Sequence, residues 1–207
     1  MKTRLDLPAG YAPVLHVDLQ KDKKKMLLVN GLALAIGIVL TIIGHCIVPV
    51  GIMFRMDEGL LAYLARFIAL LGGMIVYVIL HELVHGVFMK RFSGKKPSYG
   101  FAGAYAYAGS DAYFDKKSYI IIALAPVVVW GVVLALFNVF VSEQWFWVVY
   151  FIQVNNLSGA AGDYYVVWKF RSLPKDILVQ DNGVSMMVHG KSKPRVERVV
   201  CTSPKRA

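Results

Sequence analysis

Charged residues are scarce in this chain of 207 residues: Asp, Glu, Lys and Arg together make up only 17% of it. A soluble domain usually carries about 25% charged residues, and a disordered chain carries few apolar ones. Here hydrophobic residues reach 57%, and the mean hydropathy is +0.54. The composition therefore excludes an intrinsically disordered protein and argues against a soluble enzyme.

Cysteine and acidic residues are also few. Two cysteines, Cys46 and Cys201, cannot build a disulfide framework. Asp and Glu number 13 against 23 Lys and Arg, which gives a formal net charge of +10. No nucleic-acid recognition motif accompanies this basic excess. We therefore assign it to membrane topology and to contact with anionic lipids, and we expect no nucleic-acid partner.

Long apolar runs dominate the rest of the sequence, and each is long enough as a helix to cross about 30 Å of hydrocarbon. Basic residues gather before the first run, between the second and third, and after the fourth. By the positive-inside rule, both termini and the loop between the second and third runs are then cytoplasmic. The four expected spans are 26–50, 67–89, 119–141 and 145–168.

The sequence thus predicts an all-α membrane protein with four transmembrane helices, cytoplasmic at both termini, and with only small β-hairpin elements on the cytoplasmic side. Residues 1–25 form a flexible cytoplasmic N-terminal segment in this interpretation. Residues 26–168 form the membrane domain, which includes a cytoplasmic β-like loop at 97–115. Residues 169–207 form a cytoplasmic tail with a small hairpin.

Two short patterns favour the strands in those cytoplasmic parts. Large rings alternate with small residues between Tyr99 and Tyr107, a period of two that is typical of a strand. An aromatic belt at the membrane interface explains the pattern nearly as well. If the segment is a strand, the edge of its sheet could hold an extended peptide. In the tail, residues 177–188 predict a hairpin around a type I′ turn at Asp181-Asn182-Gly183.

Ionisable residues interrupt the second apolar run, as His81-Glu82-Leu83-Val84-His85. Histidines four apart lie on one helical face and can share a zinc ion, and the glutamate between them can take a proton from the attacking water. A charged group at mid-membrane costs about 3 kcal/mol, so the cluster requires a reason. A satisfied polar cluster or a proton relay is the alternative. We predict that His81 and His85 bind zinc and that Glu82 is the catalytic base.

A catalytic zinc site needs a third protein ligand. With a helix rise of about 1.5 Å per residue, Asp163 matches the depth of His81 and His85 below the cytoplasmic boundary. His45 and Glu143 lie towards the opposite face. Asp163 is therefore the predicted third ligand, and an ion pair with a lysine at the inner surface is the alternative for it.

The run that carries Asp163 also holds amide side chains, which are rare in an apolar span. They are candidates for contact with a substrate or with the metal ligands, and hydrogen bonding between helices explains them about equally well. These residues are Gln153, Asn155 and Asn156.

From the second span to the tail hairpin, the chain resembles a family of small bacterial membrane proteins grouped as zincin peptidases, which are similar to the site-2 proteases. The zinc motif carries over as His81, Glu82 and His85. The aspartate ligand of the site-2 family follows an asparagine by eight residues, as Asp163 follows Asn155, although its pair with glycine is reversed here. The resemblance also suggests that Pro126 stands near a helix start.

These observations predict an intramembrane zinc metalloprotease that hydrolyses peptide bonds of membrane-associated proteins or peptides near the cytoplasmic face. The resemblance and the small size favour a bacterial plasma membrane. Two other classes stay open: a non-catalytic membrane protein that binds client helices on a zincin scaffold, and a small proton or ion transporter. The second lacks the inverted repeat that is common among transporters.

Overall fold

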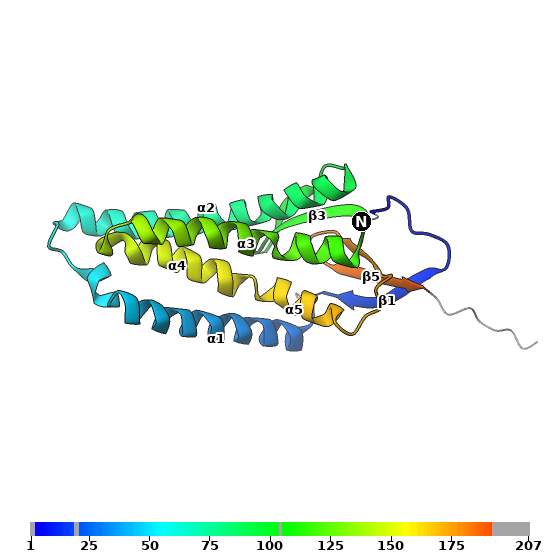
Figure 1. Ribbon diagram of the computed structural model, residues 1–207, viewed down its shortest axis with the longest axis horizontal. Coiled ribbons are helices and arrows are strands. Elements are labelled where there is room, and N and C mark those ends of the chain that lie inside the picture. Colours follow the sequence, from blue (N-terminus) through cyan, green and yellow to red (C-terminus); the bar gives the residue numbers. More distant parts are fainter. Residues whose placement is uncertain (1–2, 19–20, 104, 192–207) are drawn as a thin grey trace, which may run out of the picture.

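The computed structural model describes residues 3–18, 21–103 and 105–191, so Cys201 lies outside the described part. The helices form an elongated bundle, and the strands form a sheet at one end of it (Figure 1). The helices are α1 (Lys23–Ile47), η1, a 3-10 helix (Val50–Phe54), α2 (Leu60–Ser93), α3 (Lys116–Phe140), α4 (Glu143–Gly159) and α5 (Ala161–Phe170). The strands are β1 (Tyr11–Val17), β2 (Ser98–Ala102), β3 (Tyr105–Asp115), β4 (Leu178–Asp181) and β5 (Met186–Lys191).

The sheet corrects the fold class. Its five strands are antiparallel, in the order β1-β5-β4-β3-β2, so the protein is mixed α/β and the expected all-α fold is wrong. β1 lies in the segment expected to be flexible, and it pairs with β5 from Tyr11↔Lys191 to Val17↔Met186. Partners so far apart in sequence leave no local signal, because each strand is short and gains its stability from the others.

The two strand patterns in the sequence are confirmed. The alternating aromatic residues form β2 and the first half of β3, which pair from Ser98↔Gly109 to Ala102↔Tyr105. The tail hairpin is β4–β5, but four residues, 182–185, connect its last pair. Only Gly183 among them has a positive φ, at 87°. A type I′ turn requires two such residues, so that part of the prediction is wrong.

The membrane-spanning prediction is corrected as well. Three helices, α1, α2 and α3, are long and apolar enough to cross a membrane. The fourth expected span, 145–168, is divided at Ala160 into α4, with 17 residues, and α5, with 10. Small residues surround the break, and each glycine costs a helix interior about 1 kcal/mol relative to alanine. Gly159 and Gly162 therefore weaken the helix at the place where it ends.

α4 is the centre of the bundle, since α1, α2 and α3 all pack on it. α1 packs mainly on α4 and α5, whereas α2 and α3 also pack on each other. Close approach depends on small residues: the ring of Tyr150 occupies the space beside Gly44, and Ile152 that beside Gly73. The elements that carry the candidate site are thus held together through α4.

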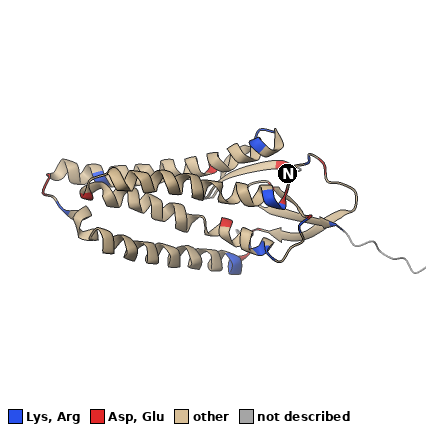
Figure 2. Cartoon of the chain, in the orientation of Figure 1, with Lys and Arg blue, Asp and Glu red and all other residues tan. Residues whose placement is uncertain are grey.

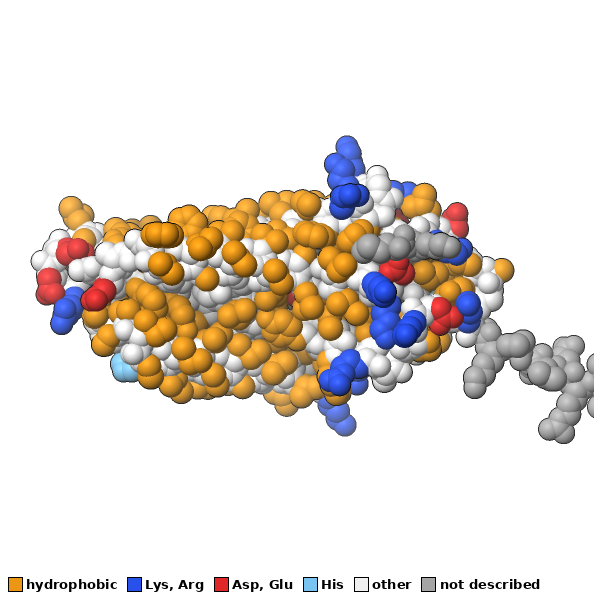
Figure 3. Space-filling view, viewed as in Figure 1, with side chains coloured by type: hydrophobic (Ala, Val, Ile, Leu, Met, Phe, Trp, Pro, Cys, Tyr) orange, Lys and Arg blue, Asp and Glu red, His pale blue; other side chains and the backbone are white. Residues whose placement is uncertain are grey.

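The face of the bundle drawn in Figure 3 is covered largely by apolar side chains, while Lys and Arg gather where the helices meet the sheet. Large apolar side chains are exposed along α1, α2 and α3. Charged residues are few along the length of the helices (Figure 2). An apolar surface of this extent is far larger than water tolerates on a monomer. It indicates association with a membrane around the helical part of the molecule.

A buried core joins the sheet to the neighbouring helix ends. Phe114 of β3, Ile122 of α3 and Phe170 of α5 are at most 1% exposed and pack with Val179 and Val188 of the tail hairpin. Because these side chains come from four segments of the chain, the core fixes α5 against α3 and the sheet. It thereby fixes the position of the first turn of α5.

Candidate metal centre

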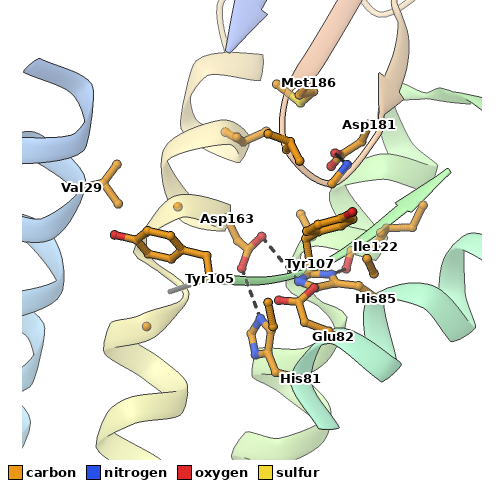
Figure 4. A pocket seen from close by; sticks show the side chains of 18 of the residues that line it. Val29, His81, Glu82, His85, Tyr105, Tyr107, Ile122, Asp163, Asp181 and Met186 are labelled. Carbon is orange, nitrogen blue, oxygen red and sulfur yellow. Dashed lines mark hydrogen bonds and ion pairs between the residues drawn. The ribbon is translucent and has the colours of Figure 1, made fainter. Parts of the chain in front are cut away.

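His81 and His85 lie one turn apart on α2 and face the same side, with their ring centroids 4.8 Å apart. Asp163, in the first turn of α5, points between them (Figure 4). Its Oδ2 is 3.6 Å from His81 Nε2, and its Oδ1 is 3.7 Å from His85 Nε2. The break between α4 and α5 starts the helical turn that directs Asp163 toward α2.

The three donors suit a zinc ion. Their ligand atoms all lie within 4.8 Å of one another. Ligand atoms of a tetrahedral zinc site lie about 3.4 Å apart, close to the two distances of 3.6 and 3.7 Å between Asp163 and the histidines. Two imidazoles and one carboxylate also form the ligand set of hydrolytic zinc sites that keep a fourth position open. The structure therefore brings together the three residues predicted as ligands.

His85 is oriented by a buried carbonyl group of α3 that lacks its usual helical N–H partner. Its Nδ1 lies 2.9 Å from the carbonyl oxygen of Ile122. A carbonyl only accepts hydrogen bonds, so Nδ1 carries the proton and Nε2 presents its lone pair toward Asp163. That carbonyl is available because Pro126, four residues later, has no N–H to donate to it. Pro126 lies inside α3, so the helix start suggested for it is wrong.

Glu82 lines the same cavity as the three donors and lies beside His85 (Figure 4). Ala108 of β3 lines the cavity as well, and β3 packs on α2. The strand therefore lies next to the candidate ligands. A carboxylate held there can exchange a proton with a group bound at the open position.

The cavity in front of these residues has a volume of about 470 Å³. This is within the range of about 300–1,000 Å³ that is typical of ligand pockets. Apolar residues of α1, such as Met26 and Val29, form one wall, and β3 and the loop between β4 and β5 form another. The candidate ligands and Glu82 lie on the α2 and α5 side.

One edge of β3 faces this cavity without a strand partner among the described residues. β2 pairs with residues 105–109 of β3 on one side, whereas β4 pairs with the other side only from Ser110 onward. Tyr105, Ala106, Tyr107 and Ala108 all line the cavity. The backbone of this segment is therefore open to an additional strand.

The three predicted amide residues have different surroundings. Asn155 lines the cavity. Asn156 is buried, and its side chain bonds to Tyr77 of α2 and to the Val127 carbonyl of α3. Gln153 Nε2 donates to the Gly131 carbonyl at 3.3 Å. Only Asn155 is thus placed to meet a substrate, and the other two bond between helices.

Two polar groups near the site were not predicted from the sequence. Tyr77 hydrogen-bonds to His81, and its position four residues earlier on the same helical face was the signal. Asp181 lines the cavity from β4 and accepts hydrogen bonds from the Tyr119 hydroxyl and the Gly183 N–H. Burial raises the pKa of Asp181. No local signal marks Asp181, because only the sheet brings it there.

Comparison with known protein families matches residues 74–178 to the family described as "Putative zincin peptidase". The match covers just over half of the chain and includes both histidines, Glu82 and Asp163. The chain belongs to this family. Membership in the zincin peptidase family implies zinc and metallopeptidase chemistry, in agreement with the geometry. No curated protein and no solved structure matches the chain.

Proposed function

We propose that this zincin peptidase is an intramembrane zinc metalloprotease, which hydrolyses peptide bonds of membrane-associated substrates near the cytoplasmic face. The observation that carries the proposal is the convergence of His81, His85 and Asp163 beside Glu82, on helices whose outer surface is apolar. The family supports the peptidase chemistry. The apolar helices support its location in a membrane.

The residues of the site divide the reaction between them. A zinc ion held by His81, His85 and Asp163 would act as a Lewis acid, which polarises the scissile carbonyl and makes the attacking water more acidic. Glu82 takes the proton from that water and later gives it to the leaving amine.

The substrate must be extended when it is cut. The carbonyls of a transmembrane helix are engaged in its own hydrogen bonds, so a peptide bond becomes accessible only after local unwinding. The open edge of β3 at residues 105–108 offers main-chain partners to an unwound segment. Because residues 105–108 line the same cavity as the candidate ligands, a strand added there runs past the candidate metal centre.

The charge distribution supports a cytoplasmic orientation of the site. Basic side chains gather at the sheet end of the bundle, which is also the end where β3 meets the metal ligands (Figures 3 and 4). By the positive-inside rule, that end faces the cytoplasm of a bacterial plasma membrane. The same basic side chains are suited to anionic lipid headgroups.

The test is cleavage of membrane-embedded model peptides by purified, zinc-loaded protein in lipid nanodiscs, compared with a Glu82→Gln variant. The substitution keeps the shape of the side chain and removes its basicity, so we expect normal zinc content and a loss of cleavage of at least about a hundredfold. Equal cleavage by the variant overturns the mechanism. Stoichiometric zinc without any cleavage by the wild type favours client binding, and proton flux that a chelator does not affect favours transport.

A further inference from the structure

We propose that Tyr77 and Asn156 are positioning residues that hold His81 in the tautomer that leaves its Nε2 free to bind a metal ion. The proposal rests on the metal centre proposed above. It concerns a hydrogen-bond network that begins at the main chain of α3, passes through Asn156 of α4 and then Tyr77 of α2, and ends at His81. Among the residues of this hydrogen-bond network, His81 alone is a candidate metal ligand.

Tyr77 is the link next to His81. It is 5% exposed, and its hydroxyl oxygen lies 2.8 Å from His81 Nδ1 and 2.7 Å from Asn156 Oδ1. A phenol has one proton to donate, so it can donate to only one of these two atoms. The direction of these hydrogen bonds therefore depends on which of the two atoms, His81 Nδ1 or Asn156 Oδ1, needs a donor.

Asn156 decides the direction. Its side chain is fully buried, and its Nδ2 lies 3.2 Å from the Val127 carbonyl oxygen and 3.4 Å from Gln153 Oε1. Gln153 cannot turn its own amide round without losing the bond from its Nε2 to the Gly131 carbonyl. Both neighbours of Asn156 Nδ2 are thus acceptors, and its Oδ1 must face Tyr77.

The tautomer of His81 follows from this orientation. Asn156 Oδ1 only accepts, so the Tyr77 proton goes to it, and the Tyr77 oxygen is left to accept from His81 Nδ1–H. His81 then has no proton on Nε2, which is the atom 3.6 Å from Asp163 Oδ2. Orientation of a ligand by the partner of its other nitrogen is a general feature of metal sites.

The two histidines are consequently oriented in different ways. His85 donates to a main-chain carbonyl, which cannot reverse its role. His81 donates to a hydroxyl, which can. If Asn156 no longer accepts, Tyr77 is free to donate to Nδ1, and the proton of His81 moves to Nε2, where it blocks the metal. Asn156 therefore controls a ligand that it does not touch.

The first experiment measures zinc affinity by competition with a chelator. For Tyr77→Phe and for Asn156→Leu we expect a loss of about 10- to 100-fold, the usual effect of removing a group that supports a ligand. Tyr150→Phe is the matched control, since its partly buried hydroxyl donates to the Leu40 carbonyl at 2.7 Å, away from the site. We expect the control to stay within about twofold of the wild type. Wild-type affinity in Tyr77→Phe overturns the proposal.

The double variant separates positioning from a structural role. Because Tyr77 and Asn156 act through one chain, Asn156→Leu in the Tyr77→Phe background should lower zinc affinity by no more than about threefold further. If the two residues contributed independently, their fold losses of zinc affinity would multiply in the double variant, and that outcome overturns the proposal. Where Asn156→Leu fails to fold, the single Tyr77→Phe variant and the spectroscopic test below decide.

The second experiment observes the tautomer directly. Nitrogen-15 histidine NMR of the metal-free protein, at about pH 8.5 where free imidazole is neutral, distinguishes a proton on Nδ1 from one on Nε2. We expect the Nδ1–H form for His81, assigned with a His81→Gln variant, and a shift towards Nε2–H in Asn156→Leu. An Nε2–H form in the wild type overturns the proposal. Since no metal is present, this result does not depend on whether the protein cleaves peptides.

Discussion

Pro126→Ala should make the protein more stable and its metal site weaker. Proline inside a helix costs about 3 kcal/mol relative to alanine, and Pro126 lies well inside α3. Alanine restores an N–H that points at the Ile122 carbonyl. This N–H then competes with His85 Nδ1, which lies 2.9 Å from the same oxygen. A net hydrogen bond is worth about 1 kcal/mol, and the carbonyl has two lone pairs, so the competition is partial.

We therefore expect a rise in the thermal unfolding temperature of the metal-free variant and a fall in zinc affinity of up to about fivefold, the equivalent of about 1 kcal/mol. Differential scanning fluorimetry and chelator competition measure the two effects separately. Pro49→Ala is the control, because Pro49 precedes η1 and lies far along the chain from the ligands. Zinc affinity that stays equal or increases in Pro126→Ala refutes the role assigned to the freed carbonyl.

Three further predictions concern the ligands, the packing and the pH dependence. Asp163→Ala should lower zinc affinity by more than the 100-fold or so that loss of a supporting group causes, and metal analysis of the purified variant checks this. Gly44→Ala places a methyl group in the space of the Tyr150 ring and should cost about 1–3 kcal/mol in thermal unfolding, whereas Gly31→Ala, which meets nothing within 4 Å, should be neutral or stabilising. Burial raises the pKa of Asp181 above its ordinary 3.8, so its folded form favours the proton, and the stability that it contributes is lost as the pH rises through the raised pKa. Asp181→Asn should then unfold at a higher temperature than the wild type at neutral pH and not at acidic pH, and a gap of the same size at every pH would contradict this.

The site was more predictable than the fold. His81 and His85 could be paired from their spacing alone, because a helix places residues four apart on one face. Asp163 could be added from its depth in the membrane, since depth depends only on position along an apolar run. The sheet could not be assembled in this way. β1 and β5 are separated by most of the chain, and neither has a sequence pattern that identifies the other as its pairing partner.

The break between α4 and α5 was missed for a related reason. The apolar run 145–168 has the composition of a continuous span, and hydropathy does not reflect the low helix propensity of Gly159 and Gly162. One unbroken helix was expected for that run, which also holds the amide residues. In the structure the run divides at Ala160, so that Gln153 and Asn156 bond between helices while Asp163 reaches the histidines.

Both irregularities in the helices serve the same group of atoms. Pro126 interrupts the hydrogen bonds of α3 and releases the carbonyl that orients His85. The break at Ala160 ends α4 and begins the turn that brings Asp163 to both imidazoles. Each lowers local helix stability, and in lipid an unsatisfied main-chain group is especially costly. Departures of this kind persist where a site needs them, so an interruption in an apolar run is itself a signal of where polar chemistry will be found.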